Sequence, residues 1–289
     1  YSEESEPVIV SPMYVVFSVN NDRILPRYLD CYFRSNVGKY QITSKVEQGV
    51  RFRLPFDALA TLSVPLPPIL VQKEIVCMLD TFTALDTELE AELAARTKQY
   101  EHYRNYLLIN HRLFDDGTDL FEVPEHSLDE VCLPVSNIRW NENADKTFRY
   151  IDLTSTDRAT KSIQNTDTIT SENAPSRAQQ IVRVNDVIFG STRPTLKRYA
   201  FITDEFDGEI CSTGFCVLRS DPKKVLPKYL YFHISSTAFE NHVEKYQRGS
   251  AYPAITDKDL KSFKIPVPPL EVQEQIVSIL DRFEALVND

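Results

Sequence analysis

The residues with the clearest chemical potential are basic and gather in one part of the sequence. Residues 174–203 carry five lysine or arginine side chains and one acid, Asp186, although the whole chain has a formal net charge of −10. At the centre lies Gly190-Ser-Thr-Arg-Pro-Thr-Leu-Lys-Arg-Tyr199, a polar segment between two apolar runs. Hydroxyls and backbone amides can position phosphates, and an arginine can bond a guanine edge with two hydrogen bonds. The candidate nucleic-acid contacts are Arg177, Ser191, Thr192, Arg193, Thr195, Lys197, Arg198 and Tyr199.

A second polar segment, Arg248-Gly-Ser-Ala-Tyr252, combines a cation, a glycine and an aromatic ring. It adds Arg248, Ser250 and Tyr252 to the candidates. The alternative for both segments is an ordinary solvated loop, because five basic residues among thirty are not rare. The net charge of −10 argues against non-specific nucleic-acid binding by the whole protein, but it leaves room for a local basic face.

Metal, cofactor and catalytic motifs are missing from the sequence. The five histidines have no His-Glu-x-x-His spacing, and the five cysteines include no Cys-x-x-Cys pair. The seven glycines form neither a Gly-x-Gly-x-x-Gly motif nor a phosphate-binding loop, and no Gly-x-Ser-x-Gly elbow is present. We therefore expect no metal site, no cofactor and no catalytic residue, although a hydrolase whose polar residues are dispersed along the sequence stays open as an alternative.

The chain carries no sign of a membrane-spanning or secretory segment. No apolar run approaches the ~20 residues that span a bilayer. The acidic start, Tyr1-Ser-Glu-Glu-Ser-Glu6, lacks the apolar centre of a signal peptide. An odd number of scattered cysteines is typical of a reducing compartment. We expect a cytoplasmic protein with no membrane partner.

An internal repeat organises the chain. The sequence VPLPPILVQKEIV at 64–76 returns as IPVPPLEVQEQIV at 265–277, which is 201 residues later. When the comparison is extended to 22 positions, starting at Val64 and Ile265, twelve positions are identical. The sequence ILPRYL at 24–29 also returns, as VLPKYL, after 201 residues. The chain is therefore interpreted as about one and a half copies of a 201-residue unit, with the first copy beginning part-way through.

Each copy of the proline-rich motif leads into a helical sequence. Residues 69–112 contain no proline or glycine, and apolar residues recur there at alternating spacings of four and three. A helix of ~40 residues would be ~60 Å long, and a narrow apolar seam of this length predicts a coiled coil. An amphipathic helix packed on its own domain is the alternative. The seam residues are Ile75, Leu79, Phe82, Leu89, Leu93, Tyr100, Tyr103 and Leu107.

The seam generates three expectations. Residues 71–110 should form one nearly continuous helix, and the start of a second helix over 270–289 should pack beside it. Part of the seam should lack a full partner and stay open to water, which makes it an association site. Self-association, or dependence on a partner protein, is therefore expected. The residues expected to be open are Leu89, Leu93, Tyr100, Tyr103 and Leu107.

The stretch 120–264 has a different character. Short runs rich in β-branched and aromatic residues are separated by polar turns, which predicts strands. Two helices are expected to follow, from Pro227 to about Ser235 and from Thr237 to about Tyr246. The predicted fold class is therefore α+β. The predicted strands are Phe148–Leu153, Gln180–Val184, Asp186–Phe189, Tyr199–Ile202 and Gly214–Leu218.

The repeated motif resembles a known family. The pattern Ile/Val-Pro-x-Pro-Pro-x-x-x-Gln-x-x-Ile-Val, running into Leu-Asp-x-Phe-x-Ala-Leu, is similar to type I restriction–modification DNA specificity subunits. The helical sequence from Ala94 to Leu108 and the segments 185–200 and 211–218 are also similar to that family. The resemblance covers essentially the whole chain, and the doubled motif is more specific than the basic segment alone.

The resemblance implies globular target-recognition domains joined by long coiled-coil spacer helices. Each such domain reads one half of a split DNA site, and the helices fix the distance between the halves. The four expected parts are the C-terminal half of a first target-recognition domain at 1–64, a spacer helix at 65–115, a complete second target-recognition domain at 116–264, and the start of a second spacer helix at 265–289.

Function and partners follow from the same resemblance. The family's specificity subunit is not catalytic; methyltransferase subunits modify adenine with S-adenosylmethionine, and restriction or translocase subunits cleave unmodified DNA. The expected partners are therefore double-stranded DNA, methyltransferase subunits and restriction subunits. The chain departs from the family's two complete units, and we interpret it as a fragment, a truncated gene product or a trimmed form. A helical scaffold whose globular domains bind proteins instead of DNA is the alternative.

Overall fold

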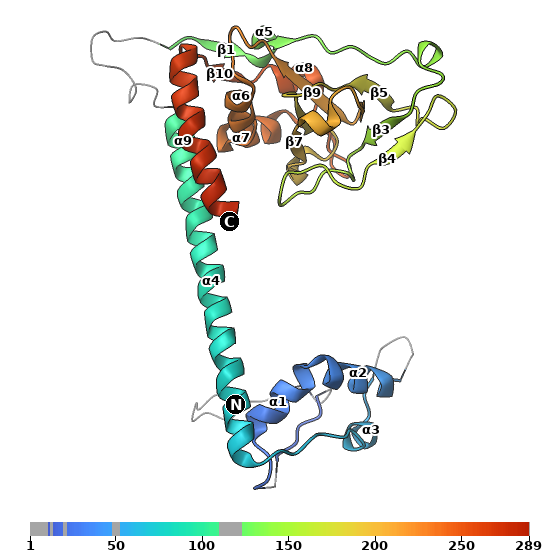
Figure 1. The fold of residues 1–289 in the computed structure, drawn as a ribbon, viewed down its shortest axis with the longest axis vertical. Helices are drawn as coiled ribbons and strands as arrows, with labels where there is room; N and C mark the ends of the chain where they lie inside the picture. Colours follow the sequence, from blue (N-terminus) through green and yellow to red (C-terminus); the bar gives the residue numbers. More distant parts are fainter. Residues whose placement is uncertain (1–10, 12–13, 20–21, 48–52, 110–122, 289) are drawn as a thin grey trace, which may run out of the picture. The chain divides into compact units, whose positions relative to one another are not determined.

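The computed structural model describes residues 11, 14–19, 22–47, 53–109 and 123–288. The chain divides into two compact units, Tyr1–Leu93 and Ala94–Asp289. One long helix contributes residues to both units (Figure 1). The expected boundary between residues 115 and 116 lies outside the described residues, so the four-part division remains a prediction.

The described part of the first unit is mainly helical. Its helices are α1 (Pro26–Arg34), α2 (Asn36–Lys45), α3 (Phe56–Ala60) and the N-terminal part of α4 (Ile69–Ile109). Pro26 suits the first position of α1 because its backbone angle is already that of a helix. Ser35 caps α2 by accepting a hydrogen bond from Gly38 N. Helix α4 begins directly after the proline-rich motif, as its sequence predicts.

Helix α4 is unbroken over 41 residues. The continuous helix expected from the apolar seam is therefore confirmed over its described length. Alanine, glutamate, leucine and arginine dominate residues 84–98, and these residue types favour the helical backbone. The large apolar side chains between residues 78 and 93 are exposed. Helix propensity, rather than burial, therefore stabilises this part of α4.

The described part of the second unit contains three sheets. The strands are β1 (Glu125–Ser127), β2 (Cys132–Leu133), β3 (Phe148–Ile151), β4 (Asp167–Ile169), β5 (Ala178–Ile181), β6 (Val187–Gly190), β7 (Tyr199–Phe201), β8 (Ile210–Ser212), β9 (Phe215–Ser220) and β10 (Lys264–Pro266). The two larger sheets have the orders β2-β9-β6-β7 and β4-β3-β8-β5, and β1 pairs with β10. Strands β3 and β8 are parallel, whereas the other neighbours are antiparallel.

Helices complete the second unit. They are α5 (Leu128–Val131), α6 (Pro227–Ile234), α7 (Thr237–Tyr246), α8 (Asp257–Lys261) and α9 (Leu270–Asn288), with single 3₁₀ turns at Trp140–Glu142, Pro194–Leu196 and Asp204–Phe206. The two helices expected after residue 226 are confirmed as α6 and α7, and the α+β fold class is confirmed with them. Each expected strand overlaps an observed one. The largest shift is in β5, which ends at Ile181; Arg183 N donates to the side chain of Asp186 instead of to a neighbouring strand.

Sheet β2-β9-β6-β7 is buried on both faces. Along β6, Val187 and Phe189 join the cluster built around α6 and α7, whereas Ile188 joins the cluster between the two four-stranded sheets. Along β7, Tyr199 belongs to the first cluster and Ala200 to the second. Successive side chains of a strand point to opposite faces. The segment that joins β6 to β7 is therefore anchored at both ends by buried residues.

The sequence repeat is also a structural repeat. Helices α1, α2, α3 and α4 begin 201 residues before α6, α7, α8 and α9 respectively. In the first unit Glu47 and Arg53 form an isolated β-bridge, and their counterparts Arg248 and Ala254 form one in the second unit. The repeat therefore preserves the backbone structure as well as the residue types.

A buried glutamine fixes the start of α9. The side chain of Gln273 is fully buried. Its amide oxygen accepts a hydrogen bond from Leu226 N at 2.9 Å. Its amide nitrogen donates to Lys224 O at 2.9 Å and to Pro268 O at 2.8 Å. One side chain thus joins the first turn of α9 to the residues that lead into α6, and it leaves no polar atom of that amide unpaired.

Gln72 makes the same three hydrogen bonds in the first unit. It is also fully buried. Its amide oxygen accepts from Leu25 N at 2.9 Å, and its amide nitrogen donates to Arg23 O and to Pro67 O, both at 2.7 Å. The glutamine of the repeated motif therefore has one structural role, used once in each unit.

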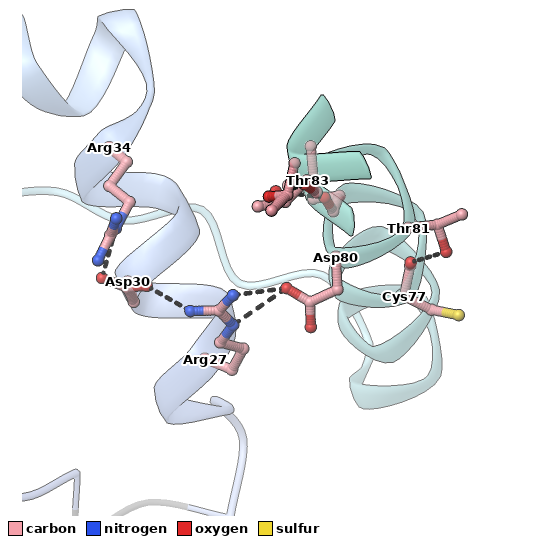
Figure 2. A network of polar contacts seen from close by, with 9 residues as sticks. Arg27, Asp30, Arg34, Cys77, Asp80, Thr81 and Thr83 are labelled. Atoms are coloured by element: carbon pink, nitrogen blue, oxygen red, sulfur yellow. Dashed lines mark hydrogen bonds and ion pairs between the residues drawn. The ribbon is translucent and has the colours of Figure 1, made fainter. Parts of the chain in front are cut away.

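An ion pair supports the same junction between α1 and α4 (Figure 2). Arg27 donates from Nη2 and Nε to Asp80 Oδ1, at 2.6 and 3.2 Å, and from Nη1 to Asp30 Oδ2 at 2.9 Å. These side chains are largely open to solvent, so the pairs add little to stability. The counterpart of Arg27 and Asp80 in the second unit is Lys228 with Asp281, at 3.4 Å.

Helix α9 packs antiparallel against the C-terminal part of α4, within the second unit (Figure 1). The rings of Tyr103 and Phe283 stack with centroids 5.3 Å apart. Arg96 Nη1 donates to Leu286 O at 3.4 Å. The earlier residue of α4 thus contacts the later residue of α9, as expected for two antiparallel helices. The expected packing of the second helix beside the first is confirmed.

The strip expected to be open to water is only partly open. Leu89 and Leu93 are 63% and 52% exposed, but Leu107 is 8% exposed and Tyr100 is partly buried. The expectation was wrong for the last two because Ile276 of α9 packs in the same apolar cluster. Helix α9 thus covers the C-terminal part of the seam and leaves the middle of α4 exposed.

Three tyrosines lie where β7 meets α6 and α4. Tyr199 lies edge-to-face with Tyr231 of α6, at 5.8 Å between centroids. Arg104 of α4 is buried and lies 5.3 Å above the ring of Tyr100. Burial raises the pKa of Tyr199 to about 12, and it also raises the pKa values of Tyr100 and Tyr231. Arg104 partly offsets the pKa shift at all three hydroxyls, so one guanidinium acts on the whole group.

Replacing Gln273 with alanine should lower the free energy of unfolding of the second unit by about 2–4 kcal/mol, because one buried and two partly buried hydrogen bonds to the backbone are lost. Trp140, the single tryptophan of the chain, lies in this unit, so its fluorescence during urea denaturation measures the change. Glu274→Ala, at an exposed neighbouring position, is the control and should stay within about 0.5 kcal/mol of wild type. Equal losses in the two variants would contradict the role of the amide.

Two leucines at equivalent positions of the repeat should respond differently to truncation. Leu280 is fully buried under α4, so Leu280→Ala should cost about 2–5 kcal/mol of unfolding free energy. Leu79 is 43% exposed, and Leu79→Ala should cost less than about 1 kcal/mol. Circular dichroism during denaturation gives both values. A similar cost at the two positions would mean that Leu79 is also covered.

Alkaline pH should destabilise the second unit through Tyr199. Its folded pKa of about 12 lies above the ordinary value of ~10, so folding favours the neutral hydroxyl. The contribution of this hydroxyl to the free energy of unfolding is complete below pH ~10. It is lost as the pH rises towards about 12, which lowers the free energy of unfolding by about 2–3 kcal/mol. Urea denaturation at successive pH values should therefore show a shallower decline for Tyr199→Phe than for wild type. Parallel declines would rule out this role.

Candidate nucleic-acid interface

The basic segment between β6 and β7 forms a rigid turn. Arg193 and Lys197 have left-handed backbones, with φ of 48° and 52°, on either side of the 3₁₀ turn. Such a backbone is uncommon outside glycine and costs on the order of 1 kcal/mol per residue. Arg193 N donates to Pro253 O at 2.7 Å, which holds the strained residue in place. The turn presents the exposed side chains of Arg193, Thr195 and Lys197 to solvent.

The second predicted segment lies directly beside the first. Thr192 and Ala254 form an antiparallel β-bridge, and Ile255 N donates to Ser191 O at 2.9 Å. Backbone contacts, and not only side chains, therefore join two segments that lie far apart in the sequence. We call the surface formed by residues 190–199 and 248–254 the basic surface.

Arg193 and Tyr252 form the exposed centre of the basic surface. The guanidinium carbon of Arg193 lies 4.4 Å from the centroid of the Tyr252 ring, and Tyr252 is 70% exposed. The chain turns at Gly249, whose φ of 98° favours glycine. A Cβ at this position would also lie only 3.1 Å from Tyr252 O. No carboxylate among the described residues pairs with Arg193. The ring orients the guanidinium without neutralising its charge.

Two other cations of the basic surface have acidic partners. Lys197 Nζ lies 2.7 Å from Glu240 Oε1, and Arg248 Nη2 lies 3.5 Å from Asp259 Oδ2. Both cations remain at least half exposed, so an incoming phosphate would compete with carboxylates that water already screens. Arg198 is half-buried within the basic segment.

Arg177 belongs to the same neighbourhood through a turn. The carbonyl of Arg177 accepts a hydrogen bond from Thr213 N at 2.9 Å. The carbonyl of Gly214, which follows Thr213, accepts one from Ser191 N, also at 2.9 Å. The side chain of Arg177 is exposed. The turn between β8 and β9 therefore brings Arg177 and the basic segment to the same end of the unit.

Two predicted contacts face the protein interior. Tyr199 is 9% exposed, so its ring has no face available to a nucleic-acid base, and its prediction as a contact is not supported. The physical reason is the alternation along β7, which directs this ring towards α6. Ser191 Oγ donates to Gly214 O at 2.9 Å and thus serves the fold. Thr192 is half-buried, whereas Ser250 is exposed.

A third segment touches the basic surface and was missed in the sequence. Lys161 Nζ donates to Lys197 O at 2.8 Å and to Arg158 O at 2.5 Å, and it lies 4.5 Å above the ring of Tyr199. Burial, followed by the charge of Lys197, lowers the pKa of Lys161. The available signal in the sequence was a polar turn with two cations, Asp157-Arg-Ala-Thr-Lys161.

Metal ligands and thiols are the other side chains of the described residues that could carry chemistry. Among them, no group of three or more histidine, cysteine or acidic side chains is placed to hold a metal ion. Burial raises the pKa of the Cys132 thiol to about 12 and also raises the pKa values of Cys211 and Cys216. These three thiols are therefore poor nucleophiles. None of the described helices is both long and apolar enough to cross a membrane.

Comparison with known proteins identifies relatives over most of the chain. The family described as the type I restriction modification DNA specificity domain matches residues 2–99 and 133–289. A type I restriction enzyme specificity subunit of Escherichia coli is 28% identical, over 96% of this chain and 68% of its own length. A putative type I restriction enzyme specificity subunit of Haemophilus influenzae is 31% identical, over 82% of this chain and 60% of its own length.

Solved structures of type I restriction–modification proteins are also similar to this chain. The HsdS subunit from Thermoanaerobacter tengcongensis is 36% identical, with a TM-score of 0.54 over 60% of this chain and 45% of that one. A structure described as a type I R-M system is 37% identical, with a TM-score of 0.53 over 58% of this chain and 44% of the other. The chain thus spans less than half of these two proteins. Because the family match includes both copies of the repeated motif, the chain belongs to the type I restriction–modification DNA specificity family.

Proposed function

We propose that this chain is a DNA sequence-specificity subunit of a type I restriction–modification complex. The observation that carries the proposal is the basic surface, where two distant segments meet around an exposed Arg193 that no described carboxylate neutralises. An arginine held in a fixed orientation can donate two hydrogen bonds to a guanine edge in the major groove. The relatives named as specificity subunits support the same function.

The side chains of the basic surface divide into two roles. Arg193 is the candidate for direct base contact, and the exposed ring of Tyr252 keeps its guanidinium in place. Lys197 and Arg248 are candidates for phosphate contacts, since each is exposed and can exchange a screened carboxylate for a phosphate oxygen. The hydroxyl of Thr195 is exposed and suits a phosphate as well.

The long helices are assigned to spacing and assembly. In the proposed complex α4 and α9 belong to spacer helices, and the specificity subunit binds methyltransferase and restriction or translocase subunits while reading a split site. The subunit itself performs no catalysis and works in the cytoplasm. The exposed apolar residues of α4 support the assembly role, because a strip of this kind favours contact with another helix.

A protein-binding scaffold is the second candidate function. The net charge of −10 and the exposed Leu79, Phe82, Leu89 and Leu93 favour it. The salt dependence of binding affinity distinguishes the two functions. Binding through phosphates weakens steeply as the salt concentration rises, whereas apolar association does not.

Methylated-site mapping tests the proposed function. The chain is co-expressed with a cognate methyltransferase subunit, and methylated adenines are mapped across the host genome. A defined sequence context around those adenines is expected, together with co-purification of the two proteins. Methylation without a shared sequence, or no association between the proteins, would overturn the proposal.

Arg193 and Lys197 should differ in how they affect DNA binding. Arg193→Ala should weaken binding to the specific site by about 1–3 kcal/mol and relax the preference at one base pair. Lys197→Ala should weaken all sequences alike and reduce the slope of log K against log salt by about 0.9, because one phosphate contact is lost. Fluorescence anisotropy at several salt concentrations measures both effects.

Arg139→Ala is the matched control for both substitutions. Arg139 is also exposed but pairs with Glu142, outside the basic surface. Its removal should leave both the affinity and the salt slope unchanged. If all three variants bind as the wild type does, the basic surface is an ordinary solvated surface.

A further inference from the structure

Residues 154–164 form a hairpin that is ordered by its own hydrogen bonds. Thr156 and Ile163 form an antiparallel bridge, and Gln164 N donates to Ser155 O at 2.7 Å. At the tip, Asp157 Oδ1 accepts hydrogen bonds from the backbone nitrogens of residues 159 and 160, both at 2.8 Å. These bonds lower the pKa of Asp157 and keep its carboxylate turned to the backbone of the tip.

The base of the hairpin is fixed to the strands that carry the basic surface. Ser155 and Thr156 are 2% and 4% exposed, and Ile163 packs against the cluster between the two larger sheets. Leu153, just before the hairpin, lies so close to Gly190 that a Cβ there would meet its Cδ2 at 3.1 Å. The hairpin is therefore fixed directly beside the end of β6.

Lys161 joins the tip of the hairpin to the basic surface. Its ammonium group bridges two backbone carbonyls, one from Arg158 in the hairpin and one from Lys197. No carboxylate among the described residues lies within ion-pair distance of it. An ammonium group bound to neutral carbonyls and an aromatic face keeps its charge and also fixes two chain segments relative to each other.

The exposed tip carries an arginine whose side chain has no role in the described fold. Arg158 is exposed, and its side chain has no carboxylate partner among the described residues. The neighbouring Asp157 makes no ion pair with it, because that carboxylate is turned to the backbone of the tip. Arg158 and Lys161 together outnumber this one carboxylate, so the tip extends the positive potential of the basic surface beyond Lys197.

We propose that residues 154–164 form a third DNA-contacting segment, in which Arg158 binds a phosphate of double-stranded DNA and Lys161 is a positioning residue for Arg158 and Lys197. This inference rests on the proposed function of the basic surface. A phosphate is the acceptor because Arg158 stands on a turn fixed by backbone contacts, beside another cation suited to phosphate. Contacts of this type set the orientation of a protein on the duplex, while base contacts read the sequence.

The experiment compares Arg158→Ala, Lys161→Met and Lys223→Ala in the full chain. Lys223 is exposed and lies near the start of α9, so its removal is the charge-matched control. Two probes are used: a random-sequence duplex pool, and the duplexes that the wild-type chain enriches from that pool. Anisotropy at several salt concentrations gives the affinity and the salt slope for each probe, and thermal denaturation confirms folding of each variant.

The two hairpin variants have different expected signatures. Arg158→Ala should weaken binding to both probes by about fivefold and lower the salt slope by about 0.9. Lys161→Met removes a charge that contacts no phosphate, and Arg158 and Lys197 keep their own charges, so it should leave the slope unchanged. It should weaken binding to the enriched duplexes by at least about threefold more than binding to the random pool, since Arg158 and Lys197 would no longer set the orientation in which Arg193 meets a base. Lys223→Ala should match wild type in every measurement.

Failure of this inference is distinguishable from failure of the proposed function. If the wild-type chain enriches no duplex and shows no salt-dependent binding, the proposed function fails. If Arg193→Ala weakens binding but Arg158→Ala changes neither affinity nor slope, only the third segment is refuted. A Lys161→Met variant that lowers the salt slope would show Lys161 to be a phosphate contact and would overturn its positioning role.

Discussion

The buried amide of Gln273 is the interaction on which the arrangement of the second unit depends. It pairs with backbone groups just before α6 and just before α9, so both helices start from one fixed point. Helix α6 contacts β6, β9 and α9, and it carries Tyr231, on which Tyr199 rests. Fixing α6 therefore also fixes the strands from which the basic surface projects. The hydroxyl of Tyr229 adds a bond to Pro266 O at 3.1 Å in the same junction.

Local patterns predicted the long elements because those elements are stabilised locally. The proline cluster, the glutamine and the alternation of four and three residues all lie within a few turns of α4 and α9, and the helix propensity of 84–98 is a property of those residues alone. Strands β1, β2, β4, β8 and β10 were not predicted. Each has only two or three residues, too few to show an alternation, and each is held by a partner strand elsewhere in the chain.

For the basic surface, residue types were predictable but neighbours were not. The contact between Arg193 and Tyr252 depends on the bridge at Thr192, which joins residues far apart in sequence, and no local pattern encodes such a pairing. The burial of Tyr199 was available from the sequence, since it shares one face of β7 with Phe201 and that face reads as apolar. The role of Lys161 was not available, because a lysine in a polar turn has the same sequence signature whether it is solvated or bridging.

An acidic chain can present a positive surface where nearby carboxylates are paired with other cations or turned away from that surface. Asp186 shows how this is achieved: it is 1% exposed and accepts two hydrogen bonds from Arg219, at 2.9 and 2.7 Å, beneath the strand that leads into the basic segment. Asp157 is occupied by backbone amides. Arg193 is fixed by a strained backbone and an aromatic ring. The entropic cost of ordering these side chains therefore falls on folding. In the proposed complex with DNA, this would favour discrimination between sequences that differ by single base pairs.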